Sequence, residues 1–274
     1  MSIDRHLEEI KSVGYTLISG VFSDDYCKKV KAQAKDDIEL LRHSKDTNQI
    51  LAGSLADKSQ EMVLNNIQNK SYTYMNLISS ELTNSVLSRL LKEGSYDDSE
   101  PYHLINSQIR ALRPYAKKQQ LHIDSNVPGV EGGYCLVGVV IVMLDDFTEK
   151  NGATRVVPKS HTYASYADNG VEYPDEVLVT GKRGDVLIFN GAMWHGSSEN
   201  LTDRERWSVN IGYGRWFIKP SFDIARSLEK TIYDQMSDSE RELMGLKTVP
   251  PLDEFERVRR KSETDFLNWE LESK

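Results

Sequence analysis

Cysteine is scarce in this sequence, and no hydrophobic run is long enough to cross a membrane. The two cysteines, Cys27 and Cys135, cannot form a disulfide framework, and isolated thiols are typical of proteins in a reducing compartment. The N-terminus lacks the apolar run of a secretory signal. The longest apolar stretch, 134–144, is too short to span a bilayer. We therefore expect a cytoplasmic protein with no membrane partner.

Basic residues are also in the minority. The chain has 34 Lys and Arg residues against 42 Asp and Glu residues, which gives a net charge of -8 and a pI of about 5.4. Proteins that bind nucleic acids normally carry an excess of positive charge, which displaces counterions from the phosphates. This balance predicts that nucleic acid is not a partner of the chain.

The hydrophobic residues, 39% of 274, are enough for one sizeable core. We expect a single domain, 1–274, made of a helical N-terminal part (1–95), a β core (about 100–218) and a helical C-terminal wrap (221–274). Helical spacing and capping residues predict helices at 6–13, 24–42 and 82–91, and a short apolar run predicts a strand at 15–18.

Short strands dominate from residue 103 onward. Alternating or continuous apolar runs predict strands at 104–112, 119–124, 134–144, 154–157, 176–180, 186–189 and 207–217. Many short strands separated by glycine-rich turns favour an antiparallel sandwich or barrel, so the fold class is mainly β with helical flanks. The polar segment 43–69 shows neither a helical nor a strand periodicity, and we interpret it as a candidate lid over a site.

Two of the six histidines stand apart from the others. We interpret His6 and His43 as surface residues and His161 as a backbone cap, and His103 has no carboxylate partner in a useful register. His122-Ile123-Asp124 places an imidazole and a carboxylate at i and i+2 of a strand, where both point to one face. Alone, this triplet is equally compatible with a hydrogen-bonded pair at a strand end.

A third candidate ligand strengthens the metal interpretation. His195 follows 73 residues later (195 − 122), after an apolar strand, and Gly196 beside it allows close backbone approach. Two histidines and one carboxylate bind iron(II) on one face and leave three adjacent positions open. Two of those positions suit the oxygens of a keto acid, and the last one suits dioxygen.

A keto acid co-substrate with a distal carboxylate also needs a charged partner. Arginine fits a carboxylate better than lysine does, because its planar fork donates two parallel hydrogen bonds. Arg206 lies 11 residues after His195 (206 − 195), and Ser208 lies on the same face of the strand. Arg204 sits in a turn, where we expect it to face solvent.

These residues carry a family resemblance. His122-x-Asp124, the segment from Asp145-Asp146-Phe147 to Pro158-Lys159-Ser160-His161, Trp194-His195-Gly196-Ser197 and Arg206 together resemble the phytanoyl-CoA dioxygenase family. The resemblance covers 100–216 closely and 14–22 more loosely. The one departure is Pro158-Lys159-Ser160-His161, where the family has Pro-Gly-Ser-His, and it affects no ligand.

The resemblance implies a double-stranded β-helix fold of the jelly-roll or cupin kind. It implies iron(II) held by His122, Asp124 and His195, with 2-oxoglutarate and O2 as co-substrates. In that family the arginine 11 residues after the distal histidine and the serine two residues after it contact the 2-oxoglutarate carboxylate, which gives Arg206 and Ser197 here. Related enzymes that chlorinate have Gly or Ala in place of the acidic ligand, so Asp124 argues against chlorination.

We therefore expect an oxygenase that hydroxylates an unactivated C–H bond of a small-molecule substrate and releases succinate and CO2. Two alternatives stay open: a non-oxidative metal-dependent lyase or isomerase, and a catalytically silent binding barrel. Gln108 and Thr154 are weaker candidates for keto acid contacts, and both are equally compatible with ordinary strand positions. Candidate substrate contacts are Arg113, Asn126, Trp194 and Trp216. The oligomeric state is left open.

Overall fold

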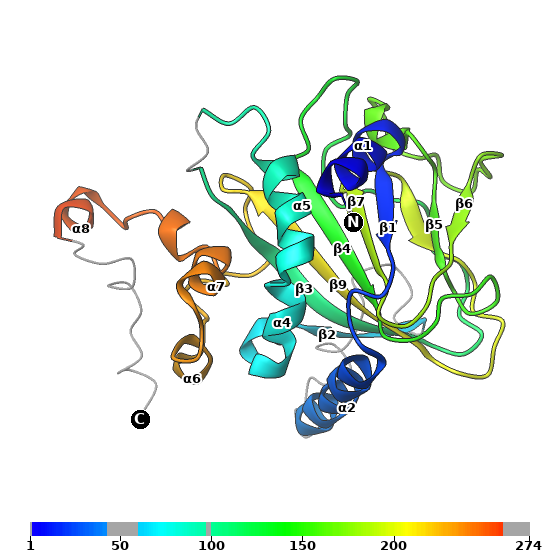
Figure 1. Ribbon diagram of the computed structural model, residues 1–274, viewed down its shortest axis with the longest axis horizontal. Helices are drawn as coiled ribbons and strands as arrows, with labels where there is room; N and C mark the ends of the chain where they lie inside the picture. Colours follow the sequence, from blue (N-terminus) through cyan, green and yellow to red (C-terminus); the bar gives the residue numbers. More distant parts are fainter. Residues whose placement is uncertain (1, 43–59, 97–99, 260–274) are drawn as a thin grey trace.

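Two antiparallel β-sheets carry the fold in the computed structural model, which describes residues 2–42, 60–96 and 100–259 (Figure 1). The larger sheet has the strand order β1-β7-β4-β9-β3-β2, and the smaller sheet has the order β6-β5-β8. The strands are β1 (Tyr15–Ile18), β2 (Glu61–Asn65), β3 (Tyr102–Leu112), β4 (Val137–Met143), β5 (Thr154–Val156), β6 (Val177–Val179), β7 (Val186–Asn190), β8 (His195–Ser197) and β9 (Arg206–Arg215).

The two sheets face each other across an apolar layer. Val139 and Ile141 of β4 and Phe189 of β7 pack in one cluster with Val156 and Val179 of the smaller sheet. These side chains come from alternate positions of β4, as the period-two geometry of a strand requires. The space between the sheets is therefore the inside of the β-helix.

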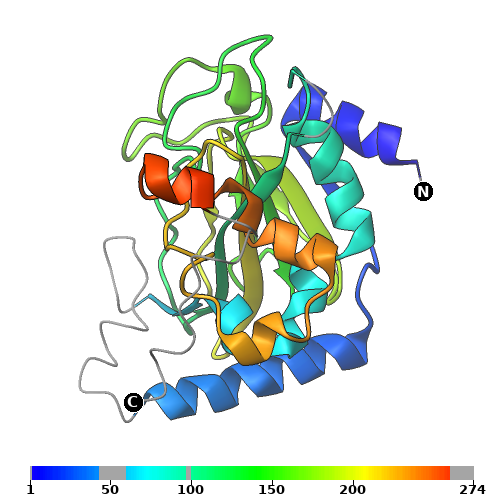
Figure 2. The same ribbon diagram turned by 90° about the vertical axis from the view of Figure 1, so that its left-hand side faces the viewer.

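Helices cover the outer face of the larger sheet (Figures 1 and 2). Val140 and Val142 of β4 point outward into a second cluster that includes Ile10 and Leu87 of the helices. Because both faces of β4 are covered, its apolar run is continuous and every residue in it is buried. The helices before the β core are α1 (Ile3–Val13), α2 (Asp24–Leu41), α4 (Met75–Ile78) and α5 (Glu81–Leu91), with 3-10 turns η1 (Ile67–Asn69) and η2 (Tyr72–Tyr74).

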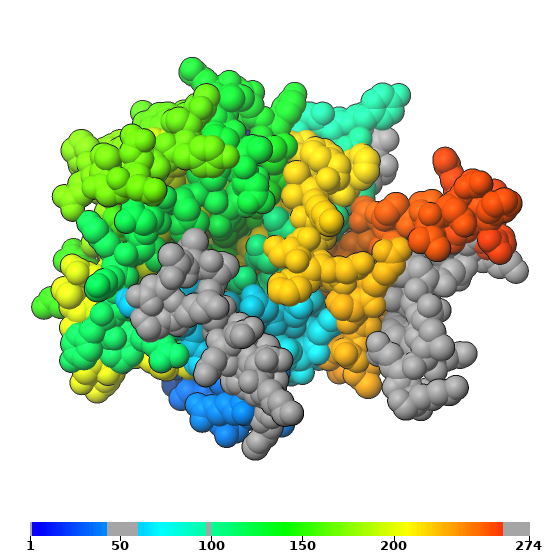
Figure 3. Space-filling model, turned by 180° about the vertical axis from the view of Figure 1, so that it is seen from behind, coloured from blue at the N-terminus to red at the C-terminus, as the bar shows by residue number. Residues whose placement is uncertain are grey.

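The C-terminal segment forms a projecting lobe of short helices, orange and red in Figure 3. It contains α6 (Lys230–Tyr233), α7 (Asp238–Leu243), η4 (Leu246–Thr248) and α8 (Glu254–Arg259), and η3 (Ser160–Thr162) lies earlier in the β core. Leu228, Ile232 and Met244 join the outer apolar cluster, whereas α8 has no buried residue. Among the described helices, none combines the length and apolarity needed to cross a bilayer.

Three predictions from the sequence are corrected. Residues 119–124 do not form a strand: only His122 makes a bridge, opposite His195. Part of the candidate lid is a strand, because β2 pairs with β3 as an edge of the larger sheet; residues 43–59 lie outside the described residues. His6 is buried, at 2% exposure, and Nδ1 of its ring lies 2.8 Å from Oγ1 of Thr16.

Packing of α5 on β4 gives a stability prediction. Leu87 is fully buried, and its Cδ2 would lie 2.6 Å from a Cβ added at Gly138, so helix and sheet are in close contact there. We expect Leu87→Ala to lower the free energy of unfolding by about 2–5 kcal/mol, because it leaves a cavity in the core. Chemical denaturation measures this change.

A matched substitution elsewhere controls for helix propensity. Leu40 of α2 is 74% exposed, and Leu40→Ala should change the free energy of unfolding by less than about 0.5 kcal/mol. Equal effects of the two substitutions would contradict the packing described here.

Candidate metal centre

The backbone joins two distant histidines directly. The amide of His122 donates to the carbonyl of His195 at 2.9 Å, and the amide of His195 donates back at 3.0 Å. This reciprocal pair forms the edge of the smaller sheet beyond β8. Gly196 permits the approach as predicted, since a Cβ there would lie 3.2 Å from the carbonyl oxygen of Gln120.

Asp124 is positioned by a turn rather than by a strand. Its amide and that of Ser125 both donate to the carbonyl of Gly191, at 2.7 and 3.0 Å. Gly191 itself lies so close to Val137 that an added Cβ would be 2.9 Å from the Cβ of that valine. The carboxylate therefore reaches the two histidines although the strand predicted at 119–124 is absent.

The three side chains present a metal-binding donor set. Their ligand atoms lie within 4.8 Å of one another. Among the described residues, this is the group of three His, Cys, Asp or Glu side chains that is placed to hold a metal ion. Oδ1 of Asp124 lies 3.8 Å from Nε2 of His122, and Oδ2 lies 3.5 Å from Nε2 of His195. Strand β8, which carries His195, pairs with β5 on one side and bridges to His122 on the other.

Each histidine is held in the form that a metal requires. Nδ1 of His195 lies 3.0 Å from the carbonyl oxygen of Met193, and Nδ1 of His122 lies 3.1 Å from that of Gln120. Since a carbonyl only accepts, each Nδ1 carries the proton and donates it, which leaves the Nε2 lone pair free. Both Nε2 atoms face Asp124.

The electrostatics favour neutral imidazole and ionised carboxylate. Burial and the neighbouring His195 lower the pKa of His122 to about 4, so its ring is uncharged at neutral pH. Burial alone would raise the pKa of Asp124, but the interactions with His195 and His122 outweigh it and lower the pKa below its usual range. Neutral imidazole and carboxylate are the states that bind iron(II).

A buried arginine closes the far end of the same cavity. Arg206 begins β9 and is 6% exposed; its Nη2 donates to the carbonyl of Gly152 at 2.8 Å, and its Nη1 donates to Oγ of Ser208 at 3.1 Å. The guanidinium carbon lies 4.3 Å from the centre of the Phe147 ring. Burial and the nearby Arg110 lower the pKa of Arg206 to about 10, so it stays positively charged at neutral pH.

Two buried donor atoms at this end of the cavity, one of them on Arg206 itself, have no hydrogen-bond partner among the described residues. Nε of Arg206 and Oγ of Ser197 make no hydrogen bond in the part of the chain that the structure describes. Thr154 lies directly opposite Ser197 in the pairing of β5 with β8. Buried polar atoms are normally satisfied, so these unpaired donors next to a positive charge indicate a place for an anionic ligand.

We call the cavity between these two ends the metal pocket. Its lining includes the three candidate ligands together with Thr154, Gly196, Ser197, Arg206 and Ser208, and it also includes residues that the sequence did not indicate: Glu61, Leu112, Gln119, Ile141 and Asn210. Arg110 lines it as well. Asn210 follows Arg206 and Ser208 at two-residue spacing on β9, a signal that could have identified it.

The other predicted contacts lie elsewhere. Gln108 shares the inward face of β3, but its amide donates to Oδ1 of Asn65 at 2.9 Å and it does not line the metal pocket. Arg113 and Asn126 are exposed. Trp194 is buried and its Nε1 donates to the carbonyl of Ser165, while Trp216 is 46% exposed and lines a different cavity. A substrate contact by any of these four residues stays a prediction.

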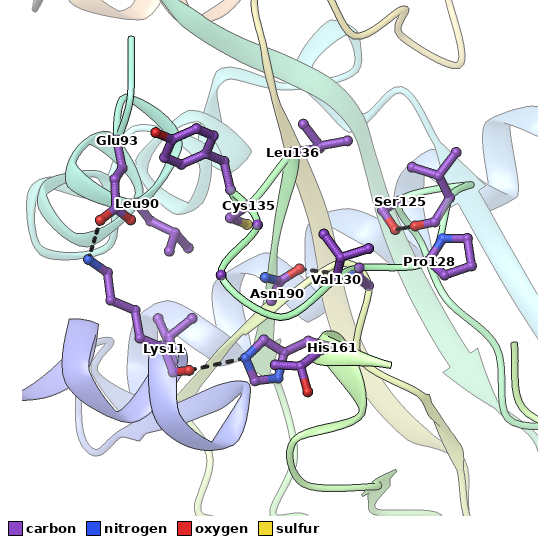
Figure 4. Close-up of a pocket in the computed structure, with 18 residues that line it drawn as sticks. Lys11, Leu90, Glu93, Ser125, Pro128, Val130, Cys135, Leu136, His161 and Asn190 are labelled. Carbon is purple, nitrogen blue, oxygen red and sulfur yellow. Dashed lines mark hydrogen bonds and ion pairs between the residues drawn. The ribbon is translucent and has the colours of Figure 1, made fainter. Parts of the chain in front are cut away.

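A second cavity of about 400 Å³ lies on the helical side of the sheet (Figure 4). Leu90 of α5, Val130, Leu136 and His161 line it, and the ion pair between Lys11 and Glu93 lies at its edge. It shares no lining residue with the metal pocket. Nε2 of His161 bonds the carbonyl of Lys11 at 3.2 Å, as expected for a backbone cap.

Paired antiparallel sheets that hold a His-Asp-His set at one end of a cavity and a buried arginine at the other define a double-stranded β-helix metalloenzyme. Residues 10–208 match the family model for phytanoyl-CoA dioxygenase (PhyH), and the chain belongs to this family of Fe(II)- and 2-oxoglutarate-dependent oxygenases. The resemblance inferred from the sequence is confirmed.

Curated relatives are similar at low identity. An uncharacterised protein of Mycobacterium tuberculosis is 26% identical over 173 residues, which cover 62% of this chain and 63% of that protein, so the chain spans less than two thirds of its length. The dioxygenase trt7 of Aspergillus terreus is 25% identical over 246 residues, which cover 86% of this chain and 81% of trt7.

Solved structures show the same fold. HygX from Streptomyces hygroscopicus with nickel and 2-oxoglutarate bound aligns with a TM-score of 0.61 at 17% identity, over 78% of this chain and 88% of that one. SnoN, a non-haem α-ketoglutarate-dependent epimerase from nogalamycin biosynthesis, aligns with a TM-score of 0.62 at 18% identity, over 84% of this chain and 88% of that one. The predicted double-stranded β-helix is thereby confirmed.

The donor set gives a direct metal prediction. We expect the protein to bind one iron(II) per chain under anaerobic conditions and His195→Ala to weaken that binding by at least about 100-fold, because one of three protein ligands is lost. Metal analysis after dialysis measures the bound iron.

His161 provides the matched control. It is also a buried histidine bonded to a backbone carbonyl, but it lies outside the cluster. His161→Ala should retain the metal, and equal loss in both variants would show that the cluster is not the binding site.

Proposed function

We propose that this chain is an Fe(II)- and 2-oxoglutarate-dependent oxygenase that hydroxylates a C–H bond of a small molecule and releases succinate and CO2. The observation that carries the proposal is the metal pocket itself. A His-Asp-His donor set lies at one end, and a buried arginine with unpaired donors beside it lies at the other.

The residues present fit both groups. Two neutral imidazoles and one carboxylate suit iron(II) and leave three adjacent positions for other ligands. When bound together, iron(II), 2-oxoglutarate and dioxygen supply the oxidising chemistry. Arg206 and Ser197 would hold the distal carboxylate of 2-oxoglutarate, and the two unpaired donors would gain partners.

The protein contributes position and a low dielectric. Phe147 covers the guanidinium of Arg206, and Ile141 of β4 forms an apolar wall of the metal pocket. Exclusion of water strengthens the interaction between the guanidinium and a carboxylate. The backbone bonds that fix Nδ1 of both histidines keep their Nε2 atoms aimed at one point.

One alternative outcome has specific support. SnoN shares the fold and is described as an epimerase that depends on the same keto acid, so the same machinery serves stereochemical inversion in a neighbour. A non-oxidative lyase or isomerase is disfavoured by Arg206, since it needs no carboxylate clamp at the far end of the pocket. A silent binding barrel is disfavoured by the intact donor set of His122, Asp124 and His195. Asp124 occupies the position that a chloride ligand would need, which disfavours chlorination.

A substitution at the far end of the pocket tests the co-substrate site. We expect Arg206→Ala to weaken 2-oxoglutarate binding by about 100-fold, because the loss of charge-assisted hydrogen bonds worth about 3 kcal/mol corresponds to that factor. Metal binding should be unchanged. Calorimetric titration of 2-oxoglutarate into the anaerobic metal-loaded protein measures the affinity for the co-substrate, and metal analysis after dialysis measures the bound metal.

Arg204 offers a control two residues away. Its side chain is exposed in the turn before β9, and Arg204→Ala should leave 2-oxoglutarate binding unchanged. If Arg206→Ala also left it unchanged, the co-substrate assignment would be wrong.

Product analysis separates hydroxylation from epimerisation. With iron(II), 2-oxoglutarate and air, a panel of small molecules should yield at least one compound that stimulates succinate formation. We expect its product to be heavier by one oxygen atom in mass spectrometry. A product of unchanged mass with inverted configuration would favour the epimerase alternative, and absence of any succinate would count against both.

A further inference from the structure

The charged side chains of the metal pocket are evenly balanced. Of the described residues that line it, four carry charge at neutral pH: Glu61, Arg110, Asp124 and Arg206. The sequence and family resemblance account for Asp124 and Arg206, whereas Glu61 and Arg110 have no assigned role. The role of Glu61 and Arg110 in the pocket is therefore still to be explained.

Glu61 and Arg110 form a two-point ion pair between neighbouring strands. Nε of Arg110 donates to Oε2 of Glu61 at 3.0 Å, and Nη2 donates to Oε1 in a second short contact. The side chains are 7% and 17% exposed. A pair this buried neutralises both charges, and its parallel bonds fix the guanidinium in one orientation.

The loaded pocket needs no further charge. The two carboxylates of the lining balance its two arginines, and the two charges of iron(II) balance the 2-oxoglutarate dianion. An additional ionised group would then be uncompensated in a site of low dielectric, where isolated charges are strongly disfavoured. A net charge on the entering part of a substrate would thus weaken its binding.

Hydrogen-bond donors remain available although the charges are balanced. Nη1 of Arg110 and Nδ2 of Asn210 both lack a hydrogen-bond partner within the described ranges, while Oδ1 of Asn210 accepts from Ser208 at 2.9 Å. Gln108, bonded to Asn65, lies next to Arg110 along the same face of β3. These groups suit hydroxyl or amide oxygens.

We propose that the primary substrate carries no net charge on the part that enters the metal pocket, and that Glu61 sets this preference by neutralising Arg110. The proposal rests on the function proposed above. Glu61 is then a specificity-determining residue. The expected substrate is a compound that bears hydroxyl or amide groups.

Two small probes of matching shape test this preference. Acetamide and acetate differ mainly in charge, and ligand-observed NMR measures their affinities for the protein loaded with zinc(II) and 2-oxoglutarate, which cannot turn over. Either probe can also reach the metal, but that contribution is common to all variants. The ratio of the two affinities in each variant therefore reports the Glu61–Arg110 pair.

Glu61→Gln, which preserves shape and exposes the charge of Arg110, should shift the ratio toward acetate by about tenfold, because one uncompensated charge then faces the probe. The double variant Glu61→Gln, Arg110→Gln removes both charges and should restore the wild-type ratio. An unshifted ratio in Glu61→Gln would overturn the proposal.

A second substitution keeps the test usable if Glu61→Gln fails to fold, as judged by circular dichroism. Glu61→Ala also exposes the charge of Arg110 and should shift the affinity ratio toward acetate, and an unshifted ratio in that variant would equally overturn the proposal. Failure of the wild-type protein to bind 2-oxoglutarate would instead remove the proposed function, and the inference with it. Normal 2-oxoglutarate binding with an unshifted affinity ratio in the Glu61 variants would refute the inference alone.

Discussion

The reciprocal backbone pair between His122 and His195 is the constraint on which the site depends. Two amide–carbonyl bonds join strand segments that are far apart in the chain, and they set the spacing of both imidazoles before any metal is present. Asp124 then needs only the carbonyl of Gly191 to complete the set. Side-chain donors placed by backbone bonds lose little conformational freedom on binding an ion, so the scaffold rather than the ion determines the geometry.

Balanced charge is the second organising feature of the pocket. Arg206 is buried with no carboxylate hydrogen-bonded to it among the described residues, and it keeps two contacts to neutral oxygens, which leaves part of its hydrogen-bonding capacity unused. Arg110, by contrast, has its charge neutralised by Glu61 through two hydrogen bonds. Two arginines in one cavity thus differ in function because only one of them has a resident counter-ion.

The sequence identified the candidate metal ligands and Arg206, but it did not identify several of the other residues that line the pocket. Periodicity and capping residues identified most strands and helices, and the spacing of His122, Asp124, His195 and Arg206 was enough to indicate where they meet. Strand β2 was missed because it is an edge strand in a polar stretch, stabilised by pairing with β3 rather than by its own pattern. Glu61 was missed with it, since no local signal reports a partner 49 residues away.

The position of β2 has a consequence for how such an enzyme changes. This strand lies at the margin of the larger sheet, whereas His195 lies on β8 of the smaller sheet, yet β2 places Glu61 in the lining of the pocket. If Glu61 sets the preference of the cavity as proposed, its substitution alters what the cavity accepts while His122, Asp124 and His195 keep their positions, because none of the three lies on β2. In evolutionary terms, selectivity can then diversify on β2 without a change in the metal-binding residues.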